Sequence, residues 1–393
     1  MKAGWQRKTI GDVCDVVNGG TPKTGVAEYW GGPHQWVTPA EMGKRATPYI
    51  DQSERTITDA GMQNSSARLL PAQSVILSSR APIGHLVINT VPMATNQGCK
   101  GLVPRNGIDT KYLYFYLASI IPLLNELGTG ATFKELSGGK LKEVPVPVAL
   151  LPEQRRIVAI LDEAFDGIAT AKANAEKNLQ NARALFESHL QSVFTERGEG
   201  WVETTLGDAY DVRDGTHDSP KFYDKGFPLV TSKNLKRDGL NFDSIKYISE
   251  EDYRKINERS RVDVGDVLFA MIGTIGNPVV VQDEPNFAIK NMALFKVPKS
   301  QSSEFLRYFL SADVTLTRMK REANGTTQKF VGLGYLRKFP IRLPTFLKQQ
   351  EIVGELDQLS TETDRLESIY QQKLAALDDL KKSLLHQAFS GQL

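Results

Sequence analysis

Short loops that combine glycine with hydroxyl, amide and basic side chains recur along the chain. They are Asn18-Gly19-Gly20-Thr21-Pro22-Lys23, Ser78-Ser79-Arg80, Thr95-Asn96-Gln97-Gly98, Asp214-Gly215-Thr216-His217, Thr231-Ser232-Lys233-Asn234 and Lys290-Asn291. Glycine lets a backbone approach a ligand closely, and Ser, Thr, Lys and Arg can hold phosphate oxygens, whereas Arg, Asn and Gln can read base edges. These loops are candidates for nucleic-acid contacts, and a polar turn in solvent is the alternative for each of them.

A Gly-x-Thr-x-Lys segment occurs twice, as Gly130-Thr132-Lys134 and as Gly325-Thr327-Lys329. Its repetition favours a shared part in binding, with a shared turn ahead of the next strand as the alternative. From these segments we predict the following side chains as nucleic-acid contacts: Thr21, Lys23, Ser79, Arg80, Asn96, Gln97, Thr132, Lys134, Thr216, His217, Ser232, Lys233, Asn291, Thr327 and Lys329.

Signatures of catalysis are missing from the sequence. It has no phosphate-binding Gly-x-x-x-x-Gly-Lys-[Ser/Thr] loop and no Gly-x-Ser-x-Gly. Neither Gly128-Thr129-Gly130 nor Gly332-Leu333-Gly334 completes a dinucleotide fingerprint. Asn277-Pro278 is followed by Val279, which excludes the box of an amino-methyltransferase, and the five histidines have no zinc-ligand spacing. We therefore expect a binding protein without catalytic residues, a metal site or a bound cofactor.

The candidate segments belong to a chain that is written twice, with an offset of about 195 residues. Trp5 with Thr9-Ile10-Gly11-Asp12 returns as Trp201 with Thr205-Leu206-Gly207-Asp208, and Val75-Ile76-Leu77 returns as Val267-Leu268-Phe269. Each copy begins with about 150 residues of short β-like runs, Gly and Pro punctuation and one helical pattern, over 111–117 and 304–310. The fold class we predict is α+β, with two mixed α/β globules in an internal pseudo-two-fold repeat.

A long helical segment follows each globule. After Pro152, apolar or small residues recur in steps of four and three, which is the period of a coiled coil. The predicted seam contains Ile157, Leu161, Ile168, Leu185, Ile352, Leu356, Leu366, Leu377 and Leu384. The first seam is rich in Ala and the second in Leu, so we expect the helices to pair as rods about 65 Å long. The alternative is two separate helices, each lying on its own globule.

These patterns predict four segments: globules at 1–150 and 198–344, and spacer helices at 151–197 and 345–393. Their net charges are +4, +2, −1 and −3, so the excess positive charge lies in the globules and weakly favours a polyanionic partner. No apolar run is long enough to span a membrane, the first residues lack a signal-peptide core, and two cysteines cannot make a disulfide framework. We expect a cytoplasmic protein with no membrane partner.

Three of these features carry a resemblance to a known family. They are the opening Trp5 with Thr9-Ile10-Gly11-Asp12, the core Val75-Ile76-Leu77 with Ile83-Gly84, and Leu150-Leu151-Pro152-Glu153-Gln154-Arg155-Arg156-Ile157-Val158 at the start of a long helix. On these residues the chain resembles, over essentially its whole length, the specificity (S) subunit of type I restriction–modification systems. The second copy departs from the third feature and reads Lys348-Gln349-Gln350-Glu351-Ile352-Val353.

The resemblance implies a non-catalytic DNA-recognition subunit. Each globule would be a target-recognition domain that reads one half of an asymmetric, bipartite target in double-stranded DNA. The helices would pack antiparallel, set the spacer and dock two modification subunits, which carry S-adenosylmethionine and methylate adenine N6 on a flipped base. Restriction/translocase subunits with ATP and Mg would join them. From a different class, the alternative is a coiled-coil scaffold with two protein-binding heads.

Overall fold

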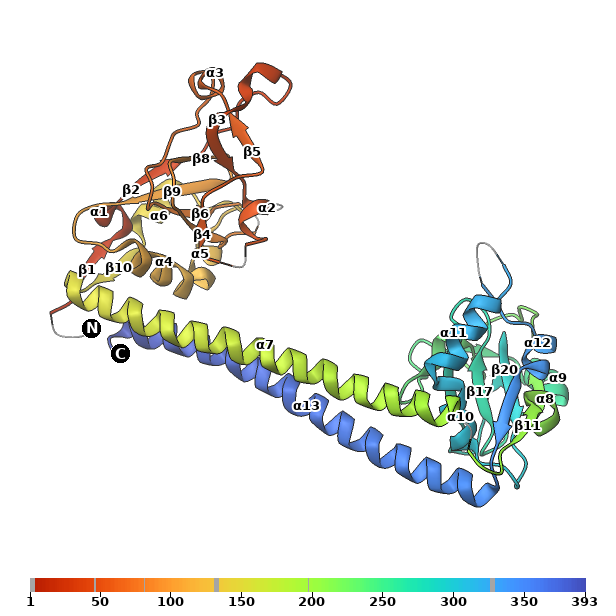
Figure 1. Cartoon of the computed structure of the whole chain (residues 1–393). Helices are drawn as coiled ribbons and strands as arrows, with labels where there is room; N and C mark the ends of the chain where they lie inside the picture. The colour runs from red at the N-terminus through yellow and green to blue at the C-terminus, as the bar shows by residue number, and fades with distance from the viewer. Residues whose placement is uncertain (1–3, 46, 81, 131–133, 197, 326–328) are drawn as a thin grey trace. The chain divides into compact units, whose positions relative to one another are not determined.

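The computed structural model describes residues 4–45, 47–80, 82–130, 134–196, 198–325 and 329–393. The chain divides into two compact units, one made of Met1–Ala175 with Gln372–Leu393 and the other of Glu176–Gln371. The long helices α7 (Leu151–Thr195) and α13 (Phe346–Ser390) each contribute to both units. Each unit therefore contains the start of one long helix and the end of the other (Figure 1).

The other elements of the first unit are β1 (Gln6–Thr9), α1 (Ile10–Val13), β2 (Cys14–Asn18), η1 (Ala27–Tyr29), β3 (Trp30–Val37), α2 (Pro39–Met42), β4 (Tyr49–Ile50), β5 (Arg55–Ile57), α3 (Asp59–Gln63), β6 (Val75–Ser78), β7 (Leu86–Asn89), β8 (Met93–Thr95), β9 (Cys99–Pro104), α4 (Thr110–Ser119), α5 (Ile121–Leu127), α6 (Gly138–Glu143) and β10 (Pro145–Val148).

Those of the second unit are β11 (Val202–Thr205), α8 (Leu206–Ala209), β12 (Asp211–Asp214), β13 (Phe227–Val230), η2 (Ser232–Asn234), β14 (Leu235–Lys236), β15 (Gly239–Leu240), β16 (Lys246–Ile248), α9 (Glu250–Ser260), β17 (Val267–Ala270), β18 (Gly276–Val280), β19 (Ala288–Ile289), β20 (Met292–Lys296), α10 (Ser303–Ser311), α11 (Asp313–Glu322), α12 (Leu333–Lys338) and β21 (Pro340–Leu343).

Strand order shows that the two units are copies of one topology. The main sheet runs β2-β9-β6-β7-β4 in the first unit and β12-β20-β17-β18 in the second. A smaller sheet, with one parallel pair in each, runs β5-β3-β8 and β16-β13-β19, and the antiparallel pairs β1-β10 and β11-β21 complete the match. The sequence repeat and the α+β class are therefore confirmed. The units differ at β4, at the β14-β15 hairpin, and in the longer helix α9, which takes the place of α3.

Aromatic side chains fix the globule of each unit to the long helices. In the first unit, Tyr112 and Tyr116 of α4 pack edge-on against Phe389 of α13, and Phe115 packs against Phe165 of α7. In the second unit, Phe305 and Phe309 of α10 pack in the same way against Phe194, which belongs to α7. The end of α13 therefore does in one unit what the end of α7 does in the other.

A buried glutamine stands at the start of each long helix. Gln154 donates from Nε2 to the carbonyls of Gly107 (2.9 Å) and Ala149 (2.7 Å) and accepts the Asp109 N–H at 2.8 Å. Gln349 donates to the Pro344 carbonyl (3.0 Å) and to Gln301 Oε1 (2.7 Å), and accepts the Ser302 N–H at 2.9 Å. Both side chains are completely buried. The second copy thus keeps these contacts although the residues around Gln349 differ.

The long helices run antiparallel within each unit. In the first unit Arg156 donates to the Leu393 carbonyl, and Lys172 pairs with Asp378. Residue numbers therefore rise along α7 in the direction in which they fall along α13. In the second unit Arg183 pairs with Glu367 at 2.8 Å, and Leu190 shares a core with Ile352 and Leu356. The separate-helix alternative does not describe either unit.

The buried stripe of α7 departs from the heptad that the sequence suggested. Ile157, Leu161 and Ile168 are buried as expected, but the stripe then passes to Leu179 and Phe186, and Leu185 is 62% exposed. From Ile157 to Val193, successive residues of the buried stripe are three or four positions apart. These ten intervals cover 36 residues, so the period is 3.6, which is that of a straight helix. In α13, Ile352 and Leu356 are buried, and Leu366, Leu377 and Leu384 are half-buried, as is Leu374.

Within the described ranges, no helix is both long enough and apolar enough to cross a bilayer.

Leu185 and Leu190 form a matched test of the helix stripe, because they lie on the same helix and only Leu190 is buried, at 5% exposure. Truncating Leu190 to Ala should lower the free energy of unfolding by about 2–5 kcal/mol, through lost burial and a cavity. Leu185→Ala should change it by less than about 0.5 kcal/mol. Urea unfolding of the two variants measures this difference. Equal losses of unfolding free energy would show that Leu185 is buried between the helices after all.

Gln349 and the exposed Gln350 form a second matched pair. Gln349→Leu leaves the Ser302 N–H and the Pro344 carbonyl without the partner that Gln349 gives them, and we expect a loss of about 3 kcal/mol. Gln350→Leu should be nearly neutral. A calorimetric scan of the two variants compares them, and similar midpoints would show that the Gln349 hydrogen bonds do not hold the helix start.

Candidate nucleic-acid interface

Backbone hydrogen bonds bring three of the predicted loops together in the first unit. Gly20 N–H donates to the Thr95 carbonyl (2.8 Å), which places the loop after β2 beside the β8–β9 turn. Ser79 N–H donates to the Gly98 carbonyl (2.7 Å), so the end of β6 joins the same cluster. Thr21, Arg80, Asn96 and Gln97 are thereby gathered in one place, and Thr21 Oγ1 contacts Gln97 Oε1.

Two indole rings hold the first of these loops. Trp36 Nε1 donates to the Gly20 carbonyl at 2.8 Å and Trp30 Nε1 donates to the Lys23 carbonyl at 3.3 Å. Gly20 must be glycine, because a Cβ there would lie 2.3 Å from the Ala67 nitrogen. The exposed Lys23 ammonium is therefore carried by a loop whose backbone is fixed on both sides.

A short hairpin closes the cluster. Thr129 and Glu135 exchange two backbone hydrogen bonds (3.0 and 2.8 Å), and Leu136 N–H donates to the Ser79 carbonyl. Arg80 Nε pairs with the Glu135 carboxylate at 3.1 Å, and Lys134 is exposed beside it. The predicted contact Thr132 lies outside the described residues.

Ser79 needs a correction, because it is not a surface residue. Its side chain is completely buried and its hydroxyl donates to the Gly98 carbonyl at 3.2 Å. The sequence placed Ser79 next to an arginine in a polar run, and burial cannot be read from that run alone. Ser79 fixes the loop and does not face a ligand.

The second unit builds the equivalent cluster with different side chains. Gly215 N–H donates to the Met292 carbonyl and Thr216 N–H to the Ile289 carbonyl, both at 3.0 Å. Lys290 Nζ donates to the carbonyls of His217 and Asp218 and to Ser219 Oγ, so it holds this loop as the two tryptophans hold the first. The sequence suggested Lys290 as a ligand-binding residue, but its ammonium is occupied within the fold.

Three charged or polar side chains surround His217. Its Nε2 lies 2.9 Å from Asp214 Oδ2 and its Nδ1 lies 2.9 Å from Asn291 Oδ1, and Arg259 also pairs with Asp214. Burial raises the pKa of Asp214, but the hydrogen bonds from His217 and Arg259 outweigh it and leave that pKa below its ordinary value. The fold brings the predicted contacts His217 and Asn291 together on the buried carboxylate of Asp214, which stood in a candidate loop but was not among the predicted contacts.

The remaining predicted residues of the second unit lie around this cluster. Lys290 N–H donates to the Val230 carbonyl (2.9 Å), so Ser232 and Lys233, which follow Val230, lie beside Lys290-Asn291. Asn324 and Phe330 exchange two hydrogen bonds of 2.9 Å, and Gly273 N–H donates to the Lys329 carbonyl. This hairpin matches the one at Thr129 and Glu135, and Thr327 lies outside the described residues. Lys23, Lys134, Lys233 and Lys329 are exposed, and none pairs with another described residue.

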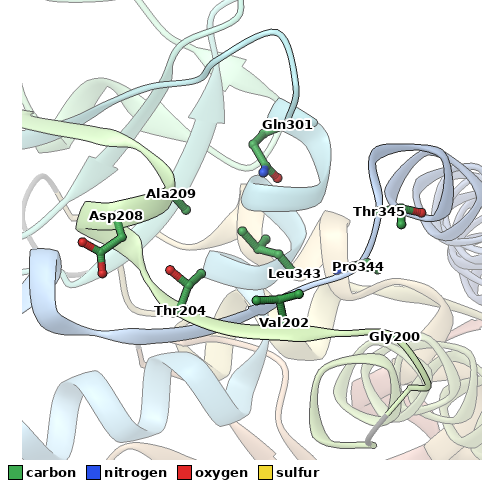
Figure 2. A pocket seen from close by; sticks show the side chains of 9 residues that line it. All are labelled: Gly200, Val202, Thr204, Asp208, Ala209, Gln301, Leu343, Pro344 and Thr345. Atoms are coloured by element: carbon green, nitrogen blue, oxygen red, sulfur yellow. The ribbon is translucent and has the colours of Figure 1, made fainter.

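Two shallow hollows, each of about 360 Å³, lie in the second unit. One is lined by Asp211, Arg213, Asp214, Arg259, Leu333 and Arg337 and so adjoins the His217 cluster. Figure 2 shows the other, where the Asp208 carboxylate, Thr204 and Gln301 surround the side chains of Val202 and Leu343. It shares no residue with the predicted loops. In the part of the chain that the structure covers, His, Cys, Asp and Glu form no group of three or more that could hold a metal ion.

Comparison with known proteins agrees with the repeat. The family model described as "Type I restriction modification DNA specificity domain" matches residues 2–180 and again residues 198–376. The chain is 32% identical over 280 residues to the type I restriction enzyme MjaIX specificity subunit of Methanocaldococcus jannaschii. That match covers 65% of each chain, a little under two thirds of the relative's length.

Solved structures share the fold. A chain from structural work on complex assembly and conformational transition of the type I R-M system superposes with a TM-score of 0.79 at 18% identity, over 100% of this chain and 99% of that one. The HsdS subunit from Thermoanaerobacter tengcongensis gives a TM-score of 0.67 at 17% identity, over 100% and 98%. At these identities the likeness shows the fold alone.

Asp214 should make the second unit sensitive to acid. Because its folded pKa lies below the ordinary value of 3.8, its contribution to stability is present above that value and is lost as the pH falls through the folded pKa. Asp214→Asn should lower stability at pH 7 and flatten the acid limb. Urea unfolding between about pH 3 and 7 tests this, with the exposed Asp211→Asn as control, and parallel curves for the wild type and Asp214→Asn would contradict it.

Proposed function

Because the chain belongs to the family of type I restriction–modification DNA specificity domains, of which it carries two, we propose that it recognises a bipartite sequence in double-stranded DNA. Each unit reads one half of the target through its loop cluster. The resemblance found in the sequence is confirmed at the level of the family.

One observation carries the proposal: the two clusters stand at equivalent strand ends of one topology but present different side chains. The first offers Thr21, Asn96 and Gln97, and the second offers His217 and Asn291 on a buried Asp214. Amide and imidazole groups can read base edges, and their different arrangement predicts two different half-sites. The target is therefore asymmetric.

The exposed lysines of the clusters supply phosphate contacts. Lys23 and Lys134 in the first unit and Lys233 and Lys329 in the second are exposed and unpaired among the described residues. Contacts of this kind carry no base information and release counterions, so binding weakens as salt rises.

The long helices serve as spacer and docking surface for two modification subunits. Leu185 of α7 and Leu380 of α13 stand at equivalent positions of the repeat and are 62% and 46% exposed. Equivalent exposed leucines on the two helices favour two copies of one partner. We assign the recognition domains to 1–150 and 198–344 and the spacer helices to 151–197 and 345–393.

The chemistry belongs to the partners. Modification subunits supply S-adenosylmethionine and the methyl transfer to adenine N6, and restriction/translocase subunits supply ATP and Mg. This chain binds none of these cofactors and performs no catalytic step. It selects the site.

Matched insertions test the spacer. Four residues added after Ala175 in α7 and four after Gln371 in α13 lengthen both helices by about 6 Å and keep their register. Expressed with the modification subunits, this variant should methylate the same half-site letters with a spacer about two base pairs longer. Methylome sequencing of the host DNA reports both quantities.

The control is the same insertion in α7 alone, after which the pairs Lys172–Asp378 and Arg183–Glu367 no longer fit one register, and it should reduce methylation. New letters at an unchanged spacer would contradict the proposal. A gel shift with duplex DNA at low salt that shows no binding, with and without the partners, would favour the protein-binding scaffold.

A further inference from the structure

A lysine is buried inside the first unit at the edge of its loop cluster. Lys100 lies on β9, paired with Asn18 of β2 on one side and with Leu77 of β6 on the other. Its side chain shares a sheet face with the fully buried Leu102, and the residue is only 6% exposed. Asn18 begins the loop that carries Thr21 and Lys23, so Lys100 lies next to the start of that loop.

The Lys100 ammonium has no hydrogen bond and no ion pair among the residues described. The nearby Glu135 carboxylate, whose charge acts on Lys100, is taken by Arg80 at 3.1 Å. Two fully buried side-chain polar atoms in the described ranges have no hydrogen-bond partner, Tyr210 Oη and Asn257 Oδ1. Lys100 Nζ does not belong to this group. At 6% exposure, a small part of Lys100 is open to solvent.

A nearly buried ammonium without a partner among the described residues lowers the stability of the folded protein, because its desolvation is not compensated. Burial lowers the pKa of Lys100, and Arg80 adds to that effect while Glu135 opposes it. The topology itself does not require a cation at this point. In the second unit the equivalent residue is Ala293, which pairs with Asp214 as Lys100 pairs with Asn18, and it is completely buried.

The charges around Lys100 indicate what it binds. Arg80, Lys100 and Lys134 gather at the cluster with Glu135 as the carboxylate among them, which leaves an excess of positive charge. We propose that Lys100 binds a phosphate oxygen of the DNA backbone and so fixes the register in which Thr21 and Gln97 meet the bases of the first half-site. The inference rests on the proposed function and adds a positioning residue to it.

A charge-assisted hydrogen bond to phosphate would give the ammonium a partner that it lacks among the described residues, in surroundings where water screens it little. The second unit has no counterpart of this lysine. The contact is therefore specific to one half of the target.

The test is Lys100→Met in the full chain with its modification subunits, which removes the charge and keeps the length of the side chain. Affinity for target duplex DNA should fall about tenfold or more, and the slope of log K against log salt should become shallower by about one. The thermal midpoint should stay level or rise, because an unpaired buried ammonium is removed. Lys8→Met, on β1 and exposed, controls for the loss of one positive charge and should leave affinity nearly unchanged.

Lys100→Arg should keep the salt slope. Wild-type affinity and slope in Lys100→Met would overturn the inference, as would a lowered midpoint, which would show that the ammonium has a structural partner. A methylome relaxed at one base pair with an unchanged slope would overturn the phosphate assignment in favour of a base edge. If the wild-type complex itself failed to bind duplex DNA, the proposed function would fail, and this inference with it.

Discussion

Everything in each unit depends on how the globule is joined to its long helix, and a single buried amide makes that join. Gln154 and Gln349 each tie three segments together: the end of a strand, the turn before a core helix and the first turn of the long helix. An amide suits this place because it both donates and accepts. With the helix start fixed, aromatic side chains of α4 and α10 pack against the long helices.

The two units share one frame but differ in the side chains of their loop clusters. The order of the matched strands is the same and backbone bonds join the loops in both units, whereas the groups that hold the loops differ. Two indole N–H groups fix the Gly20–Lys23 loop, and one lysine ammonium fixes the loop after Asp214. Since the frame is independent of these details, side chains at the loop tips can change without disturbing the core. The bipartite recognition that we propose needs that independence.

Much of this arrangement could be predicted from the sequence, because repetition and periodicity are long-range signals. The duplicated α+β topology and the long helices followed from residue patterns, whereas the contact between Thr21 and Gln97 became visible only in the structure. Finer features did not. Leu185 has the hydropathy of a seam residue, and only the drift between periods of 3.5 and 3.6 places Phe186 inward instead. Ser79 and Lys100 look like surface residues until the strands around them are known, because polar residue type says little about burial in a sheet.

Because each long helix belongs partly to both units, the two units can fold on the ribosome only in a certain order. The second unit is one continuous stretch, Glu176–Gln371, and can close as soon as that stretch has emerged. The first unit must wait, because Leu385, Ala388 and Phe389 complete a core begun by Trp5 and Ile10. Met1–Ala175 therefore stays open while the second unit is made, until Gln372–Leu393 follow and complete its core.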